Sequence, residues 1–247
     1  MSFTVDRSVL ICATRATVFS FFTDPARWAD WWGAGSTVDG RPGGALLIRY
    51  PNGDTASGHI VELDPPARVV FTFGYDKPGK PIAPGGSRVV VTLEERPAGT
   101  LLTLLHEVAD PATSEEHVAG WRFQLSLFAV AAARVQHDPA AAADRWFAAW
   151  AETDPAARRA ALAAACTADI VLRDNYACID GMAELDAHIA AAQRHMPGQT
   201  MQRAGEPRHC QGTAVVPWTT PKSSGHNVFD FAPDGRIARV VGLWRAP

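Results

Sequence analysis

The sequence predicts an α+β fold made of two domains, and three observations support this prediction. Most of residues 1–109 alternate apolar and polar side chains as strands do, with turn sequences between the runs. Residues 113–136 then repeat apolar side chains every three or four positions, which is typical of an amphipathic helix. After Asp138-Pro139 the order reverses, so that helical patterns come first and strand patterns last.

The predicted N-terminal domain opens with a strand, "TVDRSVLICA", whose apolar residues occupy alternate positions. Helical spacing follows in "ATRATVFSFFTDPARWADWW", where Asp24-Pro25 ends one short helix and begins another. Further strands are expected over residues 45–50, 55–63, 68–75, 87–95 and 100–109. In the last of these runs one face carries Leu102, Leu104, His106 and Val108.

The helix predicted over 113–136 follows this run of strands. Its apolar stripe consists of Val118, Trp121, Leu125, Phe128, Ala132 and Val135. A single amphipathic helix after an antiparallel sheet must lay its stripe on the apolar face of that sheet. We therefore expect a sheet that grips a helix, with the space between them either filled or left as a pocket.

The boundary between the two predicted domains lies near residue 137, giving domains over 1–137 and 138–247. Asp138 is a suitable helix cap and Pro139 suits a first helical position, so a new helix starts there. The second domain is expected to contain helices in "DRWFAAWAETD", "DPAARRAALAAAC" and "GMAELDAHIAAAQRHM", with strands concentrated after residue 200.

Composition and charge exclude several classes of partner. The net charge is −3 and no basic stripe is visible, so we expect no nucleic acid and no anionic membrane as partner. No apolar run reaches the roughly 18 residues that a membrane-spanning helix needs. The opening residues resemble a strand rather than a secretory signal, and the cysteines are scattered without metal-ligand spacing: Cys12, Cys166, Cys178 and Cys210. A cytoplasmic protein with reduced thiols and no metal is expected.

The N-terminal segment, residues 1 to about 136, resembles the START-like helix-grip superfamily, in the branch related to the activator of heat-shock-protein ATPase. The resemblance is carried by "ATVFSFFTDPARWADWW", "ELDPPARVVFTF", "VVVTLEERPAGTLLTLLHE" and "GWRFQLSLFA", in matching order and spacing. It implies a hydrophobic cavity between the sheet and the C-terminal helix. The segment has no counterpart of the eukaryotic activator's N-terminal domain, which argues against a co-chaperone role.

The C-terminal segment, from about residue 139 to 247, is similar to SnoaL-like domains of the nuclear transport factor 2-like fold. The matching pieces are "RWFAAWAETDPAARRAALAAACTADIVLRD", "GMAELDAHIAAA", "GTAVVPWTT" and "HNVFDFAPDGRIARVVGLW". The resemblance implies a conical α+β barrel with a pocket at its wide end. Members include polyketide cyclases, ketosteroid-type isomerases and binding proteins, and many pair through the outer sheet face, so a homodimer is expected by analogy.

Candidate ligand-binding residues in the first domain centre on "DPARWADWWGAGS", which places three indoles within five positions. By the helix-grip resemblance this helix lies near the cavity mouth, against strands that present further aromatic side chains. The candidates are Trp28, Trp31, Trp32, Phe71, Phe73, His106 and Trp121. The alternative is that the tryptophans close the core and that His106 is a hydrogen-bonded core group.

In the second domain Asp174 is the leading candidate for catalysis, with Tyr176 as an adjacent donor. Asp174 aligns with the carboxylate that points inward in the family, where burial raises a carboxyl pKa and enables proton transfer beside a carbonyl. The alternative is that Asp174 caps the "NYACID" turn. Asp230 is a second candidate for an inward carboxylate. The pocket wall is expected to include Trp150, His188 and Trp218.

Three functions remain open from the sequence. The first is binding of a small hydrophobic, cyclic or polyketide-like molecule in one or both cavities. The second is a cofactor-independent isomerase or cyclase that uses Asp174 as general acid or base. The third is a chaperone-ATPase-linked interaction protein. Since no Walker loop, dinucleotide glycine motif or nucleophile elbow is present, we expect no cofactor.

Overall fold

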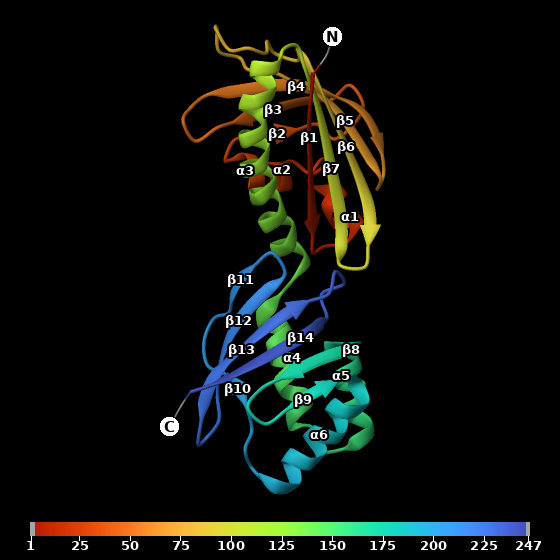
Figure 1. The fold of residues 1–247 in the computed structure, drawn as a ribbon, viewed down its shortest axis with the longest axis vertical. Helices are drawn as coiled ribbons and strands as arrows, with labels where there is room; N and C mark the ends of the chain where they lie inside the picture. The colour runs from red at the N-terminus through yellow and green to blue at the C-terminus, as the bar shows by residue number, and fades with distance from the viewer. Residues whose placement is uncertain (1–2, 246–247) are drawn as a thin grey trace. The chain divides into compact units, whose positions relative to one another are not determined.

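The computed structural model describes residues 3–245 and divides into two compact units, the first ending at Val135 and the second starting at Gln136. Each unit contains one large mixed or antiparallel sheet together with a few helices (Figure 1). The α+β class predicted from the sequence is therefore confirmed.

The N-terminal unit has one sheet in the order β1-β7-β6-β5-β4-β3-β2, and each neighbouring pair is antiparallel. Figure 1 shows the long helix α3 lying across this sheet. The elements are β1 (Phe3–Ile11), α1 (Arg15–Ser20), α2 (Pro25–Trp32), β2 (Thr37–Val38), β3 (Ala45–Arg49), β4 (Thr55–Asp64), β5 (Arg68–Phe73), β6 (Ser87–Arg96), β7 (Gly99–Val108) and α3 (Pro111–Gln136).

Local sequence explains where these elements begin and which face they bury. Asp24 caps α2, because its carboxylate accepts the backbone N–H groups of Ala26 and Arg27 and Pro25 occupies the first turn. Along β7 the even-numbered residues from Leu102 to Val108 are buried, as the alternation predicts. The predicted stripe of α3 is buried from Trp121 to Ala132, but its last member, Val135, is 42% exposed.

Aromatic rings fill the space between α2, α3 and the sheet. The side chains of Trp28, Trp31 and Trp32 are 0%, 2% and 5% exposed. The ring centroids of Trp31 and Trp32 lie 4.3 Å apart, and those of Trp31 and Phe128 lie 4.8 Å apart. The indole of Trp28 donates to the carbonyl of Leu47 at 3.2 Å. Tilted and edge-to-face contacts of this kind bury large apolar areas, so this block stabilises the unit.

His106 lies inside the same core and has a defined hydrogen-bond pattern. The indole N–H of Trp121 can only donate, so Nδ1 of His106 accepts from it at 3.0 Å and carries no hydrogen. Nε2 therefore donates to Oγ of Ser87 at 2.7 Å, and that hydroxyl donates to the Phe73 carbonyl at 2.8 Å. Burial, with a smaller contribution from His117, lowers the pKa of His106 to about 3. His106 is thus a neutral core group.

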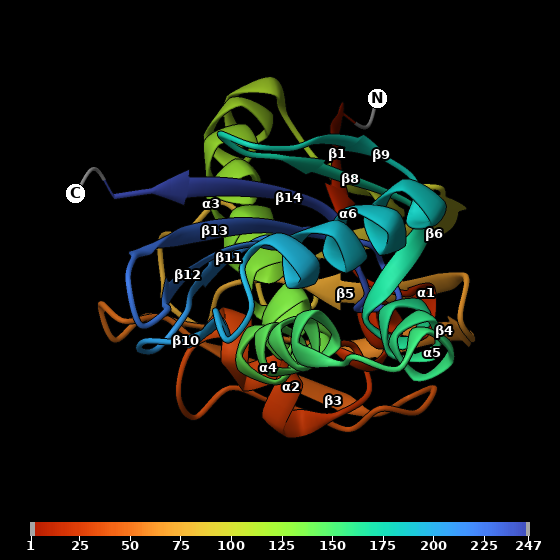
Figure 2. The same cartoon turned by 90° about the horizontal axis from the view of Figure 1, so that it is seen from below.

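The C-terminal unit has a sheet in the order β10-β12-β13-β14-β8-β9, with β11 paired to β12. Its neighbours are antiparallel except β14 and β8, which run parallel. Figure 2 shows α4 and α6 against one face of this sheet. The elements are α4 (Pro139–Ala151), α5 (Pro155–Ala165), β8 (Cys166–Arg173), β9 (Cys178–Asp180), α6 (Met182–His195), β10 (Gln202–Arg203), β11 (Arg208–Cys210), β12 (Thr213–Thr219), β13 (Ser224–Phe231) and β14 (Ile237–Trp244).

Buried polar contacts hold the three helices of this unit in place. Nε of Arg158, whose side chain is 4% exposed, donates to Asp186 at 2.7 Å and so joins α5 to α6. The amide of Gln193 donates to the carbonyls of Trp150 and Glu152 at 2.9 Å each and so joins α6 to the end of α4. Because buried charges and amides are costly to leave unpaired, these contacts fix α6 relative to α4.

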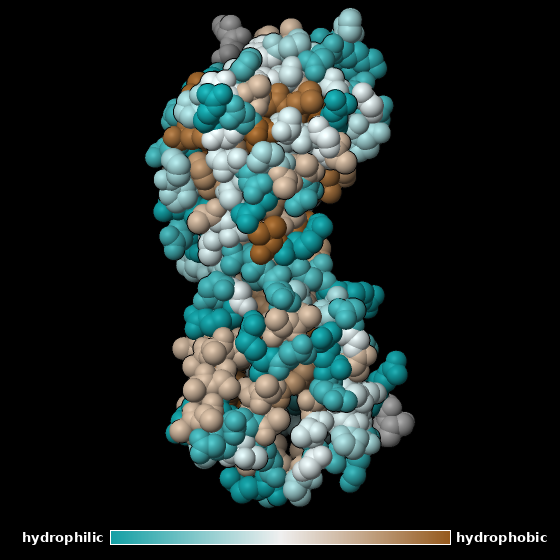
Figure 3. Space-filling view, turned by 180° about the vertical axis from the view of Figure 1, so that it is seen from behind, coloured by the Kyte–Doolittle hydropathy of each residue, from teal (hydrophilic) through white to brown (hydrophobic). Residues whose placement is uncertain are grey.

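Two further observations concern the helices and the molecular surface. No helix within the described residues is both long and apolar enough to cross a bilayer. On the face drawn in Figure 3, strongly hydrophobic residues occur only in small, separate groups.

We propose that the two units are domains that fold independently, because their hydrophobic cores share no residue. Fragments 1–137 and 138–247, expressed separately, are expected to give cooperative thermal unfolding by circular dichroism. A fragment that stays unfolded under conditions where the full chain is folded would contradict the proposal.

The buried neutral imidazole of His106 predicts acid sensitivity of the N-terminal unit. In the unfolded chain the pKa of His106 returns to about 6.5, so below this pH the unfolded state takes up a proton that the folded state does not. The free energy of unfolding should therefore be highest above pH ~6.5 and should fall as the pH drops toward 3. The expected loss is roughly 3 kcal/mol between pH 7 and pH 4.

Urea unfolding followed by tryptophan fluorescence at both pH values measures this loss. His106→Phe should be less stable at pH 7 and should lose less stability on acidification than the wild type. The control His59→Phe changes an exposed histidine on β4 and should keep the wild-type pH dependence. Equal acid sensitivity in all three proteins would rule out His106 as its source.

Candidate functional site

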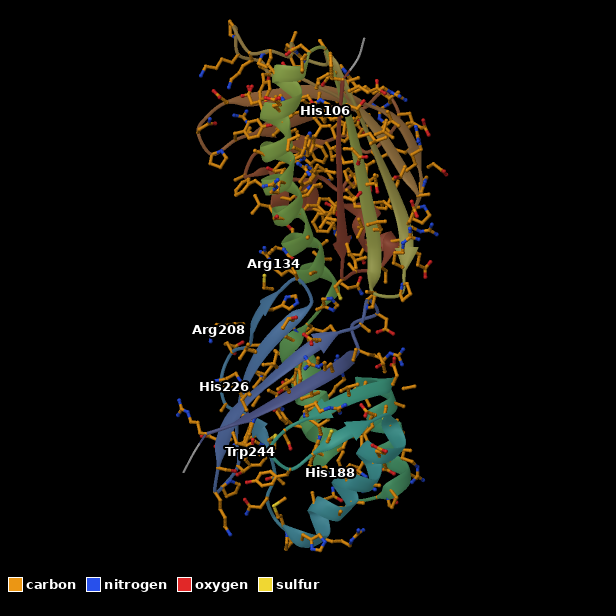
Figure 4. The ribbon with its side chains drawn as sticks, viewed as in Figure 1. His106, Arg134, His188, Arg208, His226 and Trp244 are labelled. Atoms are coloured by element: carbon orange, nitrogen blue, oxygen red, sulfur yellow. The ribbon has the colours of Figure 1, made fainter. Side chains whose placement is uncertain are left out.

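A cavity of about 660 Å³ lies within the C-terminal unit. Its walls come from the inner face of the sheet, from α4 and α6, and from the segment that follows α6. Most of the lining is apolar or aromatic, including Trp146, Trp150, Leu172, Met201 and Trp244. Figure 4 shows His188 on α6 and Trp244 at the end of β14, which line the cavity from its helical and sheet sides.

The helical wall combines aromatic rings with small residues. Trp146 and Trp150 on α4 have ring centroids 5.7 Å apart, and the Trp150 ring meets His188 edge-on at 5.8 Å. Ala191 and Ala192 on α6 leave room between these rings and the sheet. The indole nitrogen of Trp150 is buried without a hydrogen-bond partner among the described residues.

Asp174 lies at the cavity wall just beyond the end of β8. Its Oδ1 accepts the backbone N–H of Tyr176 at 2.7 Å, and its own N–H donates to the Ala177 carbonyl at 3.0 Å. The side chain is half-buried. Asp174 therefore caps the turn, which is the alternative considered from the sequence, and it also lines the cavity.

The other predicted residues of this unit differ in their placement. Tyr176 and His188 line the cavity, but Tyr176 is 73% exposed and its ring stands edge-on to Trp244 at 5.1 Å. Trp218 does not line the cavity. It is 1% exposed and packs against Trp244 at 4.8 Å, with its ring over Gly225.

Asn227 is a cavity residue that the sequence analysis missed. It lies on β13 on the same face as Phe229 and Phe231, and it is 5% exposed. A polar residue in the apolar register of a strand is the signal that could have identified it. The expectation that Asp230 points inward was wrong. Asp230 lies on the opposite face of β13, where it accepts from Thr213 at 2.7 Å and from Arg239 at 3.2 Å.

The structure brings the predicted ligand-binding residues of the N-terminal unit together as packed core. Each is at most 5% exposed, and their rings occupy the space in which a cavity was expected: Trp28, Trp31, Trp32, Phe71, Phe73, His106 and Trp121. A smaller pocket of about 260 Å³ lies between β1 and α3 and contains none of these seven.

Metal chemistry has no evident site in the part of the chain that the structure describes. Among residues 3–245, no group of three or more His, Cys, Asp or Glu side chains is arranged to hold a metal ion. Burial raises the pKa of the Cys166 thiol to about 12, so this thiol stays protonated at neutral pH.

Each comparison with known proteins matches about half of the chain. A search of curated proteins gave no match. An AHSA1-like protein from Rhizobium etli is 32% identical, over 53% of this chain and 82% of its own, with a TM-score of 0.42. CalU16 from Micromonospora echinospora is 30% identical, over 52% of this chain and 75% of its own, with a TM-score of 0.41.

A putative isomerase of the SnoaL-like family from Agrobacterium tumefaciens is also similar. It is 27% identical, over 45% of this chain and 99% of its own, with a TM-score of 0.42. The family model "Activator of Hsp90 ATPase homolog 1-like protein" matches residues 12–133. Residues 12–133 of the N-terminal unit thus match the AHSA1 family, which has the helix-grip, START-like fold.

Proposed function

We propose that the protein binds a small, largely apolar molecule in the cavity of its C-terminal unit. The observation that carries the proposal is the cavity itself, about 660 Å³ with tryptophan, leucine and methionine walls and with polar side chains between them, such as His188, Gln193 and Asn227. Sites for small molecules usually have volumes of roughly 300–1,000 Å³ and this kind of lining. Flat indole faces suit a flat cyclic guest, which agrees with the cyclic or polyketide-like ligand expected from the sequence.

We also assign this unit to the SnoaL-like domains of the nuclear transport factor 2-like fold. Its helices precede most of its strands, a single sheet packs on α4 and α6, and the cavity lies between them. These features support the assignment together with the sequence segments that resemble the family.

The geometry favours binding over proton transfer. A general acid or base in such a cavity needs a desolvated carboxyl group held near the reacting atom. Asp174 is half-buried, and one of its oxygens is already engaged by the Tyr176 backbone. Tyr176, the expected adjacent donor, contributes its backbone N–H to Asp174, and its ring is mostly exposed.

We further propose that the protein forms a homodimer through the outer face of the C-terminal sheet. Val215, Val228 and Val241 pair directly across β12, β13 and β14 and form a half-buried apolar row on that face. Leu243, on the same face of β14, is 52% exposed. An antiparallel sheet usually presents polar residues to water, so this row supports a covered face.

Filling the cavity should abolish binding. Ala192→Trp places an indole in the cavity from α6 and is expected to weaken binding of the neutral fluorescent probe N-phenyl-1-naphthylamine by at least about tenfold, because the guest and the new ring compete for one volume. Fluorescence titration measures the affinity.

Ala187→Trp is the matched control, since Ala187 lies on the exposed side of the same helix and does not line the cavity. It should bind the probe as the wild type does. The proposal fails if the wild type shows no saturable binding, or if both variants bind equally well.

The dimer can be tested by charge substitution on the two sheets. Leu243→Arg places a guanidinium on the outer face of the C-terminal sheet and should convert a dimer to a monomer in sedimentation velocity experiments. Leu105→Arg is the control, because Leu105 is 36% exposed on the outer face of the N-terminal sheet. A monomeric wild type, or a dimer lost only in Leu105→Arg, would contradict the proposed interface.

A further inference from the structure

We propose that Asn227, Gly242 and Asp174 form a polar recognition site on the cavity wall that binds a hydroxyl group of the otherwise apolar guest. This inference rests on the proposed function, because it specifies how the guest is held in that same cavity.

Strand register places the three residues side by side on the inner face of the sheet. Asn227 on β13 is directly opposite Gly242 on β14. Val241 is paired in parallel with Arg173 on β8, so the next position brings Gly242 beside Asp174. A single row across the sheet therefore contains Asn227, Gly242 and Asp174.

Gly242 lets the two polar side chains approach each other over its backbone. A Cβ atom built on Gly242 would lie 2.8 Å from Cβ of Asp174, so a larger residue would push Asp174 away. The same point lies 3.5 Å from Oδ2 of Asp174 and 3.6 Å from Oδ1 of Asn227, so both side chains lie close to this glycine. A glycine within a strand often marks a place where another group approaches the backbone closely.

Both flanking groups have unused hydrogen-bonding capacity. The Asn227 side chain is 95% buried, given its 5% exposure, and makes no hydrogen bond within residues 3–245, although it lines the cavity. Asp174 uses Oδ1 to accept the Tyr176 N–H, while Oδ2 lies beside Gly242. Because Asn227 and Asp174 both line the cavity, the Asn227 amide and Oδ2 of Asp174 can pair with a polar group of the guest.

The rows of the sheet on either side of this site are apolar. On one side Gly225 pairs with Trp218 and with Trp244. On the other side Phe229 pairs with Val240, which pairs with Leu172. The part of the guest that lies against these two rows is therefore expected to be apolar.

A hydroxyl group matches the capacity of both residues. An ionised Asp174 can only accept, whereas the Asn227 amide can both donate and accept. A guest hydroxyl can donate to Oδ2 of Asp174 and accept from Nδ2 of Asn227, which is the donor atom of that amide. A methyl group in the same position would leave both protein groups unpaired.

The test compares two probes of the same size, 2-naphthol and 2-methylnaphthalene, by displacement of N-phenyl-1-naphthylamine from the full-length protein. The wild type should bind 2-naphthol at least about tenfold more tightly than 2-methylnaphthalene. The charged amine 2-(aminomethyl)naphthalene should bind less tightly than 2-naphthol, since an ammonium group cannot accept from the amide.

Three variants should remove the preference for the hydroxyl. Asn227→Leu replaces the amide with an apolar group of similar size, and Asp174→Asn keeps the turn cap while removing the charge. Gly242→Ala should displace Asp174, because the added Cβ would lie 2.8 Å from the Cβ of Asp174. Each should lower the 2-naphthol affinity by about tenfold and leave that of 2-methylnaphthalene within about twofold. Asp230→Asn, on the outer face of β13, is the control and should retain the preference.

The outcomes separate this inference from the proposed function. If no probe binds, both are wrong. If 2-naphthol and 2-methylnaphthalene bind the wild type equally, the cavity binds apolar guests but the hydroxyl site is wrong. If the amine binds more tightly than 2-naphthol, the site recognises a cation instead, and the hydroxyl assignment is overturned.

Discussion

The parallel pairing of β14 with β8 is the constraint on which the C-terminal unit depends. It joins the last strand of the chain to the strand that follows α5, and so brings residues near 174 beside residues near 242. The sheet formed in this way supports α4 and α6 on one face. Without this pairing, the wall that carries Asp174 would not adjoin the wall that carries Asn227.

The interiors of the two units are filled to different extents, because different side chains line them. Both pack helices on one face of a sheet, and in both that face is largely apolar. In the N-terminal unit, bulky rings from α2 and α3 meet Phe71 and Phe73 and occupy the interior. In the C-terminal unit, α6 contributes Ala191 and Ala192 to the wall that faces the sheet. These small side chains leave volume that the larger residues do not fill.

This difference marks the limit of the sequence-based prediction. Periodicity identified the helix α3 and the strand faces, because these depend on spacing along one segment. Whether an interior is filled depends on the summed volume of side chains from several segments, which a one-dimensional pattern does not contain. The tryptophans of α2 were therefore correctly placed on a buried face, while the sequence alone could not decide whether that face bordered a cavity.

Asn227 and Asp174 show the same limit at the scale of single residues. Asp174 was identified because it follows an apolar strand, and the turn cap was the alternative from the sequence, but only the structure shows that the same side chain caps the turn and lines the cavity. Asn227 was missed because its significance comes from its neighbour across the sheet, Gly242, which is 15 positions away in the chain. Cross-strand neighbours of this kind become visible only when the register is known.

The close packing of Trp31 against Trp32 has an optical consequence. Two indoles with centroids 4.3 Å apart and planes inclined by 35° couple their electronic transitions. Such coupling gives a pair of bands of opposite sign in the far-ultraviolet circular dichroism spectrum. Trp218 and Trp244 in the C-terminal unit, with centroids 4.8 Å apart, form a second close pair, so the spectrum reports on indole packing in both units.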